Sequence, residues 1–370
     1  MKKIKKREIV SKAFNFLVKR PNPKEVMWLN FAVTYLCNSR CVMCSIWKKY
    51  RENPELFRQE LRLSEMENIL QSKYLQNLQG ISFTGGEPFL RKDFVDLVGL
   101  FIKRHPDAFI GVATNGLNPD LIVNKTEEIL DIYNPKRRFS ISISLDGIGE
   151  KHNEMRGIGN AYERVMETVK TLQEEFDINI GFDFTVTSWN YKDLQGVYEL
   201  SKKLGVRFLA GFAHSSDIYY DNVNNVPGWR EEELEEAELI VQEMVKDQIK
   251  NESLVTKLID PYAYFMSNSV KYEKTKGRIF KCYSGTHSLF LDPYGNVYPC
   301  IILDKKIGNI RDESFDKLWM SPRAEEVRQY IQLNKCHCWV ACEAVPSLLR
   351  GLRVARWNIA NKILRRGRLE

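Results

Sequence analysis

Short apolar runs alternate with amphipathic stretches along the first 215 residues of the chain. The apolar runs predict strands over 29–35, 80–83, 109–113, 139–145, 178–186 and 206–212. Helical periodicity between and after them predicts helices over 64–74, 94–102, 121–132, 161–172 and 194–204. Alternation of strands and helices at this spacing implies a parallel sheet. We therefore predict an α/β fold in which residues 26–215 form a partial (β/α)6 barrel of the TIM type.

The remaining segments differ from this barrel in composition. Residues 216–280 contain an acidic helical stretch, predicted over 229–255, and are expected to form a helical bridge. Residues 281–345 contain five of the eight cysteines and are expected to form a small cysteine-rich domain. Residues 1–25 and 346–370 are basic and have apolar residues at helical spacing, which predicts an amphipathic segment at each end of the chain.

The positive charge of the chain is concentrated at its two ends. Residues 1–20 carry eight Lys and Arg against Glu8, and residues 346–370 carry seven against Glu370, which gives +7 and +6. Because the whole chain has a formal charge of +7, residues 21–345 must sum to −6. Basic amphipathic helices can bind an anionic membrane surface, and they can equally pack on an acidic body. A body without net positive charge argues against nucleic acid as a partner.

The sequence also indicates where the protein acts. It contains no apolar run of membrane-spanning length, and its N-terminal residues lack the apolar core of a secretory signal. Eight cysteines in 370 residues, several of them closely spaced, are typical of metal ligands in a reducing compartment rather than of a disulfide framework. We expect a cytoplasmic protein, with peripheral attachment to a membrane as the alternative that the basic ends leave open.

Three cysteines follow the first predicted strand within eight residues: Cys37, Cys41 and Cys44. Cysteine thiolates are the ligands that hold iron–sulfur clusters, and one loop can direct three of them at a single inorganic core. Three protein ligands leave one iron of a four-iron cluster open to a small molecule, as in catalytic metal sites. A structural zinc site or buried free thiols are the alternatives at this point.

Other chemically distinctive residues follow the next predicted strands. The segment 84–88 (TGGEP) follows the second strand, Asn115 the third and Asp146 the fourth. Within the fourth strand, period-two alternation places Ser140, Ser142 and Ser144 on one face and apolar residues on the other. Because the loops at the carboxyl ends of barrel strands share one rim, we expect these residues to converge on one mouth with the three cysteines.

Four stretches of the chain together resemble the radical S-adenosylmethionine (radical SAM) superfamily: CNSRCVMC, FTGGEP, ATNG and SISLDGIGEKHNEMRG. The last is typical of the branch with a C-terminal SPASM or twitch domain, and the resemblance extends from about residue 26 to about residue 345. It implies a [4Fe-4S] cluster on Cys37, Cys41 and Cys44 with S-adenosylmethionine on the open iron. It also implies reductive cleavage of that sulfonium and hydrogen abstraction by a 5′-deoxyadenosyl radical, with electrons from a flavodoxin-like or ferredoxin-like donor.

The resemblance further implies roles for individual residues around S-adenosylmethionine. Gly85 and Gly86 would allow close approach of the backbone to its methionine end, and Glu87 would accept from the ammonium group. The candidates for binding the methionine carboxylate are Ser144 and Arg156. The candidates for contacting the ribose or adenine are Asn115 and Ser142. The sequence departs from the family at Met43, where an aromatic residue is usual, although a methionine can fill the same space.

The second group of cysteines resembles a shortened SPASM domain. Twelve residues separate Cys282 from Gly295, and four residues separate Gly295 from Cys300. The segment 292–296 (DPYGN) predicts a hairpin turn that would bring Cys282 and Cys300 side by side. Two auxiliary cubanes held only by thiolates would need about eight ligands. We therefore expect one auxiliary cluster, held by Cys282, Cys300 and two of three further cysteines, with zinc as the competing metal: Cys336, Cys338 and Cys342.

The sequence does not name the substrate or a catalytic residue that acts on it. Enzymes of the resembling kind often modify peptides or proteins, whereas the basic ends suggest a lipid-linked, polyprenyl-linked or other small metabolite at a membrane surface. A non-catalytic scaffold that binds zinc or an iron–sulfur cluster is the alternative from a different functional class.

Overall fold

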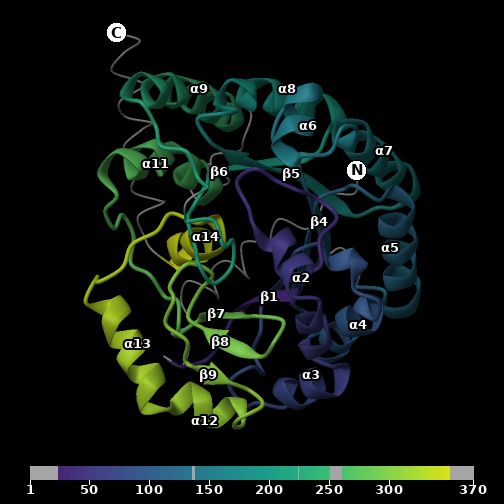
Figure 1. The fold of residues 1–370 in the computed structure, drawn as a ribbon, viewed down its shortest axis with the longest axis vertical. Helices are drawn as coiled ribbons and strands as arrows, with labels where there is room; N and C mark the ends of the chain where they lie inside the picture. Colours follow the sequence, from purple (N-terminus) through teal and green to yellow (C-terminus); the bar gives the residue numbers. More distant parts are fainter. Residues whose placement is uncertain (1–23, 136–137, 224, 251–260, 351–370) are drawn as a thin grey trace.

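The computed structural model describes residues 24–135, 138–223, 225–250 and 261–350. Its centre is a sheet of parallel strands whose spatial order, from β6 to β1, follows the order of the chain. These strands are β1 Trp28–Thr34, β2 Gly80–Gly85, β3 Phe109–Thr114, β4 Phe139–Ser144, β5 Asn179–Val186 and β6 Arg207–Phe212. The predicted α/β fold with a partial barrel is confirmed (Figure 1).

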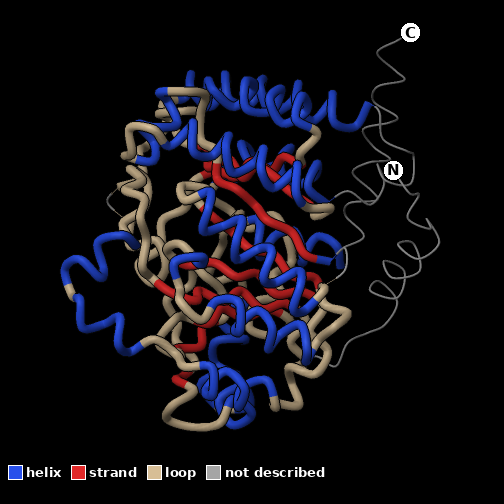
Figure 2. The backbone as a smooth tube through the Cα atoms, turned by 90° about the vertical axis from the view of Figure 1, so that its right-hand side faces the viewer, coloured by secondary structure: helices blue, strands red, loops and turns tan. Residues whose placement is uncertain are grey.

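Helices cover the outer side of this sheet (Figures 1 and 2). The Phe83 ring of β2, for example, packs edge-on against the rings of Phe94 and Phe101, with centroids 5.9 and 5.2 Å apart. The predicted alternation in β4 is also confirmed, because Phe139, Ile141 and Ile143 are fully buried on this outer side. The helices of the barrel are α3 Leu63–Leu70, α4 Phe94–Arg104, α5 Pro119–Tyr133, α6 Glu150–Arg156, α7 Ala161–Glu175 and α8 Leu194–Leu204.

Short helical turns occupy several loops of the barrel. Three of them follow the cysteine loop, one follows the double-glycine turn and one precedes α8. In chain order, the turns are η1 Ile46–Lys48, α2 Lys49–Glu52, η2 Pro54–Gln59, η3 Pro88–Leu90 and η5 Tyr191–Asp193.

The cysteine-rich region continues the barrel sheet instead of standing apart from it. Strand β7 (Ser288–Leu291) pairs in parallel with β1, and β8 (Asn296–Tyr298) and β9 (Gly308–Asn309) follow in antiparallel order. The predicted turn between β7 and β8 is confirmed: Asp292 Oδ1 accepts from the backbone N–H groups of Tyr294 and Asn296, and Gly295 has a φ of 87°. The described sheet therefore has nine strands, with β1 at the junction of the two regions.

The remaining helices close the side of the barrel between β6 and the cysteine-rich region. Helix α9 (Glu231–Lys250) buries the predicted apolar side, and α11 (Pro261–Thr275) contacts α9, β6 and α14 (Ala341–Arg350). Helices α12 (Phe315–Met320) and α13 (Pro322–Gln332) lie beyond β9 (Figure 1). The sequence predicted the acidic helix, although its expected last residues, 251–255, lie outside the described residues.

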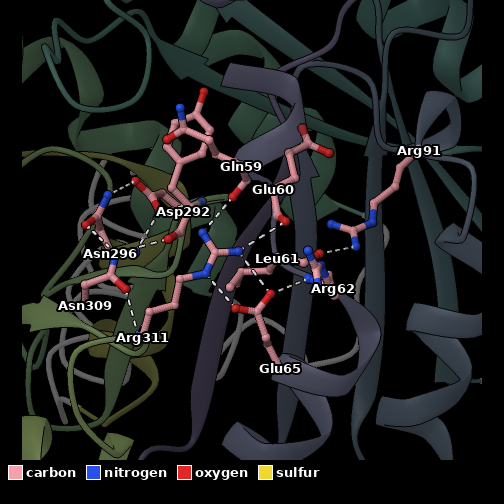
Figure 3. A network of polar contacts seen from close by, with 11 residues as sticks. Gln59, Glu60, Leu61, Arg62, Glu65, Arg91, Asp292, Asn296, Asn309 and Arg311 are labelled. Atoms are coloured by element: carbon pink, nitrogen blue, oxygen red, sulfur yellow. Dashed lines mark hydrogen bonds and ion pairs between the residues drawn. The ribbon is translucent and has the colours of Figure 1, made fainter. Parts of the chain in front are cut away.

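A polar network joins the first barrel loops to the β8–β9 hairpin (Figure 3). Arg311 forms an ion pair with Glu65 through a 2.6 Å contact from Nε, and its Nη1 donates to the Gln59 carbonyl at 2.8 Å. Arg91, which is 5% exposed, donates to the Leu61 carbonyl at 2.6 Å. Because Arg311 follows β9 and Arg91 follows β2, the segment 59–61 that accepts from both of them links the cysteine-rich region to the barrel.

The expectations for the two ends of the chain mostly fall on residues outside the described ranges, 1–23 and 351–370. The described part of the C-terminal segment belongs to α14, where Leu348 is buried. Among the described residues, no helix has the length and apolar character needed to cross a bilayer.

Candidate active site

A cavity of about 290 Å³ lies at the carboxyl ends of the barrel strands. We call it the central cavity. It is lined by segments that are far apart in sequence, and eight of the residues singled out from the sequence contribute to its wall. These are Cys37, Cys41, Cys44, Gly85, Gly86, Asn115, Ser144 and Arg156. Its volume is close to the lower end of the range typical of ligand pockets.

The three barrel cysteines are free thiols in a loop that follows β1. Arg156 Nη1 donates to Cys41 Sγ at 3.4 Å, and Ser39 Oγ lies 3.1 Å from the same sulfur. Burial raises the pKa of the Cys44 thiol to about 12, and it raises that of Cys37 as well. Thiols in such surroundings ionise when a metal supplies positive charge, so this donor set fits an iron–sulfur cluster.

A single metal ion is a poorer match to the same thiols. In residues 24–135, 138–223, 225–250 and 261–350, no three Cys, His, Asp or Glu side chains meet closely enough to hold one ion. A four-iron cluster distributes its thiolates over separate iron atoms and does not require them to meet at one point.

The double-glycine turn presses against the end of β1. A Cβ atom on Gly85 would lie 2.1 Å from the Thr34 carbonyl oxygen, and one on Gly86 would lie 2.2 Å from that of Leu36. Gly85 also has a φ of 135°, which residues with side chains rarely adopt. The turn therefore requires glycine at both positions, and its backbone faces the central cavity beside the cysteine loop.

Glu87 joins the second and third barrel loops. Its side chain is 1% exposed and accepts from the backbone N–H of Phe89 at 3.2 Å, from Thr114 Oγ1 at 2.8 Å and from the backbone N–H of Asn115 at 2.7 Å. Burial raises the pKa of this carboxyl to about 7, against the effect of these hydrogen bonds. The sequence suggested that Glu87 accepts from an ammonium group, whereas the structure places its oxygens on its own neighbours.

Arg156 is held by a buried ion pair. Its Nη2 lies 2.5 Å from Oδ2 of Asp146, a residue with no solvent exposure. Burial raises the pKa of Asp146, and the Arg156 guanidinium opposes this shift. Arg156 Nε is buried and finds no hydrogen-bond partner among the described residues. This nitrogen leaves a donor for a carboxylate ligand, which fits the methionine end of S-adenosylmethionine.

Asn115 and Ser142 were grouped as contacts of the ribose or adenine, but they lie in different places. Asn115 lines the central cavity, and its Nδ2 donates to Asn38 Oδ1 at 2.7 Å in the cysteine loop. Ser142 lines a separate cavity of about 740 Å³ that is bordered by the first residues of the strands. Ser144, two residues further along β4, faces the central cavity.

Sequence reasoning missed Asp183 in β5, which lines both cavities. Burial raises the pKa of Asp183 to about 6, and the Arg207 charge and a hydrogen bond with Ser142 oppose this shift. The signal was present in the alternation of β5, where Asn179, Asp183 and Thr185 lie on one face and Ile180, Phe182, Phe184 and Val186 on the other. The same pattern had been recognised in β4 alone.

Four of the five C-terminal cysteines, Cys282, Cys300, Cys336 and Cys338, line a cavity of about 250 Å³, here called the auxiliary cavity. Burial and the neighbouring Cys338 and Cys282 raise the pKa of Cys300, and burial with the nearby Cys300 raises that of Cys342. Cys336 differs, because Arg278 Nη2 donates to its sulfur at 3.2 Å and lowers its pKa against the effect of burial. The electrostatic neighbours thus separate a group of four thiols from Cys336: Cys282, Cys300, Cys338 and Cys342.

Glu343 follows Cys342 and ties the auxiliary cysteines to the barrel. Its carboxylate accepts from Asn30 Nδ2 of β1 at 3.1 Å, from Ser284 Oγ at 2.5 Å and from Ser288 Oγ at 2.7 Å. It is 1% exposed, and burial raises its pKa to about 7. The sequence offered no signal for this role, because the partners come from two segments that are distant from Glu343 in sequence.

One stretch of chain separates the two thiol groups. Trp339, Val340 and Ala341 line the central cavity, and they lie between Cys338 and Cys342 in sequence. Trp339 is fully buried, and its Nε1 donates to the Phe265 carbonyl at 2.9 Å. The wall of the central cavity is therefore also the loop that carries two auxiliary thiols.

Comparisons with known proteins agree with this arrangement. The family model described as "Radical SAM superfamily" matches residues 31–201, and the SPASM model, described as "Iron-sulfur cluster-binding domain", matches residues 282–343. The thiol-lined barrel mouth with a second cysteine-rich region thus defines an iron–sulfur enzyme that uses S-adenosylmethionine. The chain carries a radical SAM domain and a SPASM domain.

Similar proteins differ in what they do. An "AdoMet-dependent heme synthase" of Methanosarcina barkeri (strain Fusaro / DSM 804) is 24% identical over 318 residues, covering 80% of this chain and 82% of the relative. The "Antilisterial bacteriocin subtilosin biosynthesis protein AlbA" of Bacillus subtilis (strain 168) is 22% identical over 306 residues, 81% of this chain and 60% of the relative. The crystal structure of Streptococcus suis SuiB superposes with a TM-score of 0.58 at 16% identity, covering 87% of this chain and 71% of SuiB, which is a likeness of fold.

Proposed function

We propose that Cys37, Cys41 and Cys44 hold the cluster that cleaves S-adenosylmethionine, and that the substrate loses a hydrogen atom in the central cavity. When bound, the cluster and S-adenosylmethionine supply a 5′-deoxyadenosyl radical. The observation that supports this most strongly is the convergence of the three thiols, the double-glycine turn and Arg156 on one cavity.

The protein's own residues would bind and orient the reactants. The backbone of Gly85 and Gly86 approaches the methionine end closely, and Arg156 Nε donates to its carboxylate. Asn115, Ser144 and Asp183 offer hydrogen-bonding groups to the ribose and adenine on the facing strands. Aromatic side chains, including Phe212 and Trp339, cover the rest of the cavity and exclude water and other hydrogen donors.

We also propose one auxiliary cluster on Cys282, Cys300, Cys338 and Cys342, with Cys336 as the spare thiol. Its proposed role is electron exchange with the substrate, because the loop between two of its ligands is a wall of the central cavity. A flavodoxin-like or ferredoxin-like protein would supply the electron for cleavage of S-adenosylmethionine.

For the substrate we propose a peptide or protein side chain. The charged groups of the central-cavity wall, apart from the thiols, are Arg156, already paired with Asp146, and Asp183. This wall offers no unpaired cation to a polycarboxylate such as a coproporphyrin, the compound named in another relative, the "Fe-coproporphyrin III synthase". Attachment to a membrane surface through the basic ends is a separate proposal; liposome binding that persists after deletion of both ends would contradict it.

The test uses full-length protein reconstituted anaerobically with iron and sulfide. Dithionite and S-adenosylmethionine should yield 5′-deoxyadenosine, and its absence with an intact cluster would contradict the reaction. Fractions from cells grown in deuterated medium then identify the substrate class. Deuterium in 5′-deoxyadenosine is expected with the peptide fraction; transfer only from the tetrapyrrole or lipid fraction would contradict a peptide substrate.

A further inference from the structure

The loop after β6 crosses the mouth of the barrel and contacts the cysteine loop. We call residues 213–223 the crossing loop. The Tyr220 carbonyl accepts from the backbone N–H of Ser45 at 2.9 Å, and Asn222 Nδ2 donates to the Met43 carbonyl at 2.8 Å. These bonds connect a segment beyond the last barrel strand to residues on both sides of Cys44.

Tyr219 of this loop reaches the double-glycine turn. Its hydroxyl oxygen accepts from the Gly85 N–H at 3.1 Å and lies 3.2 Å from the Gly85 carbonyl oxygen, to which it can donate. The same hydroxyl lies 2.5 Å from Thr84 Oγ1. Tyr219 is 5% exposed and lines the central cavity. A single side chain thus engages both backbone polar groups of one glycine.

Further contacts of the crossing loop reach the SPASM domain. Ser216 Oγ donates to the Ile301 carbonyl at 2.7 Å, next to Cys300 in sequence, and also accepts from the Tyr219 N–H at 3.2 Å. The Tyr219 ring packs edge-on against Phe290 of β7, with centroids 5.4 Å apart. The loop therefore forms a chain of contacts from the auxiliary thiols to the turn at the barrel mouth.

We propose that Tyr219 is a positioning residue for S-adenosylmethionine. Its hydroxyl holds the Gly85 peptide in one orientation, and Ser216 and Phe290 fix the tyrosine from the SPASM side. This inference rests on the proposed role of Gly85 and Gly86 in binding S-adenosylmethionine.

The physical reason is the freedom of the two glycines. Glycine has more accessible backbone conformations than other residues, and Gly85 adopts one that is uncommon elsewhere. Without the hydroxyl, the Gly85 N–H would lose its acceptor, and the turn would be held less firmly, by the bond from the Gly86 N–H to the Thr34 carbonyl at 2.8 Å. Binding of S-adenosylmethionine would then have to select one orientation from several, which weakens affinity without changing the chemistry of the bound molecule.

The experiment measures binding of S-adenosylmethionine to the reconstituted full-length protein, detected by its effect on the electron paramagnetic resonance of the reduced cluster. Tyr219→Phe keeps the ring and removes the hydroxyl. We expect its Kd to rise about five- to tenfold, as for loss of one buried hydrogen bond. Its KM for S-adenosylmethionine should rise in parallel, while the rate of 5′-deoxyadenosine formation at saturation and the iron content stay unchanged. Ser216→Ala should shift the Kd in the same direction by a smaller factor.

Tyr191→Phe is the matched control. Tyr191 is also buried, and its hydroxyl donates to Glu236 at 2.6 Å on the outside of the barrel, so this variant should bind like the wild type. A Tyr219→Phe Kd within twofold of the wild-type value would overturn the inference, as would a rise matched by Tyr191→Phe. If S-adenosylmethionine did not change the electron paramagnetic resonance signal of the wild-type cluster, the proposed function itself would be overturned. That outcome is distinct from a failure of the Tyr219 inference alone, in which the wild-type signal responds and the Tyr219→Phe Kd is unchanged.

Discussion

The barrel cysteines and the SPASM cysteines are brought together in different ways. The barrel thiols lie within eight residues on one loop, and the end of a strand positions that loop. The five SPASM thiols extend from residue 282 to residue 342; four of them share the auxiliary cavity, and Cys342 at the start of α14 lies close enough to Cys300 for the two thiols to interact electrostatically. A local site can be recognised from spacing, whereas a dispersed site depends on tertiary contacts.

Each thiol group nevertheless has a buried carboxylate beside it. Glu87 lies behind the barrel mouth and Glu343 beside the auxiliary thiols, and burial raises the pKa of each to about 7. Their partners differ in kind. Glu87 accepts from two backbone N–H groups and a hydroxyl, whereas Glu343 accepts only from side chains. Because backbone N–H groups cannot rotate, we expect the Glu87 site to tolerate substitution less well than the Glu343 site.

The largest expected effect is that of removing one barrel thiol. Cys41→Ala should abolish formation of 5′-deoxyadenosine, because two thiolates cannot retain the open-iron cluster. Product analysis by liquid chromatography measures this, and the iron content of the protein should fall. Cys336→Ala, which removes a thiol outside the auxiliary group of four, is the control. Persistent cleavage in the Cys41 variant would mean that the catalytic cluster lies elsewhere.

The contrast between the sites explains how far the sequence could be interpreted. The six barrel strands and the wall formed by the cysteine loop, Gly85 and Asn115 follow from patterns confined to single strands and the loops after them. To predict the role of Asp183, one would have to know which face of β5 points into the barrel. To predict the hydrogen bonds of Glu343, one would have to know which distant segments pack together. The pairing of β7 with β1 could not be predicted either, because β7 has only four residues, and all but Ser288 are apolar.

The second effect distinguishes the auxiliary thiols from each other. Cys300→Ala should retain cleavage of S-adenosylmethionine and lose the auxiliary cluster, so iron per chain falls by about four atoms. Cys336→Ala should keep its full iron content, since the Cys336 sulfur, although it lines the same cavity, is held by a hydrogen bond from Arg278. Iron analysis and electron paramagnetic resonance compare the two variants. Equal iron loss in both would assign Cys336 to the cluster and contradict the proposed group of four.

A third pair of variants compares the two buried carboxylates, Glu87 and Glu343. Glu87→Gln places an amide NH2 group against a fixed backbone N–H, and leaving that buried group unpaired should lower the free energy of unfolding by about 1–3 kcal/mol. Glu343→Gln should be milder, at less than about 1 kcal/mol, because the hydroxyls of Ser284 and Ser288 can rotate and accept from the amide. Urea unfolding at pH 7 measures both. If the free energy of unfolding fell more in the Glu343 variant, rotation of the hydrogen-bond partners would not explain how well each site tolerates the substitution.

The smallest expected effect concerns Asp183, a buried carboxylate of β5 that lines the central cavity. Its pKa is raised from 3.8 to about 6, with Arg207, Asp146 and Arg156 as the charged groups around it. Between these pH values the unfolded chain has released the proton that the folded chain still holds, so this residue makes stability fall as pH rises. Asp183→Asn should therefore match the wild type below pH 4 and exceed it at pH 8 by on the order of 1 kcal/mol. Urea unfolding at both pH values measures the difference, and the exposed Asp312→Asn is the control on the SPASM side. A variant less stable than the wild type at pH 8 would mean that the ionised carboxylate stabilises the barrel, contrary to the effect of its burial.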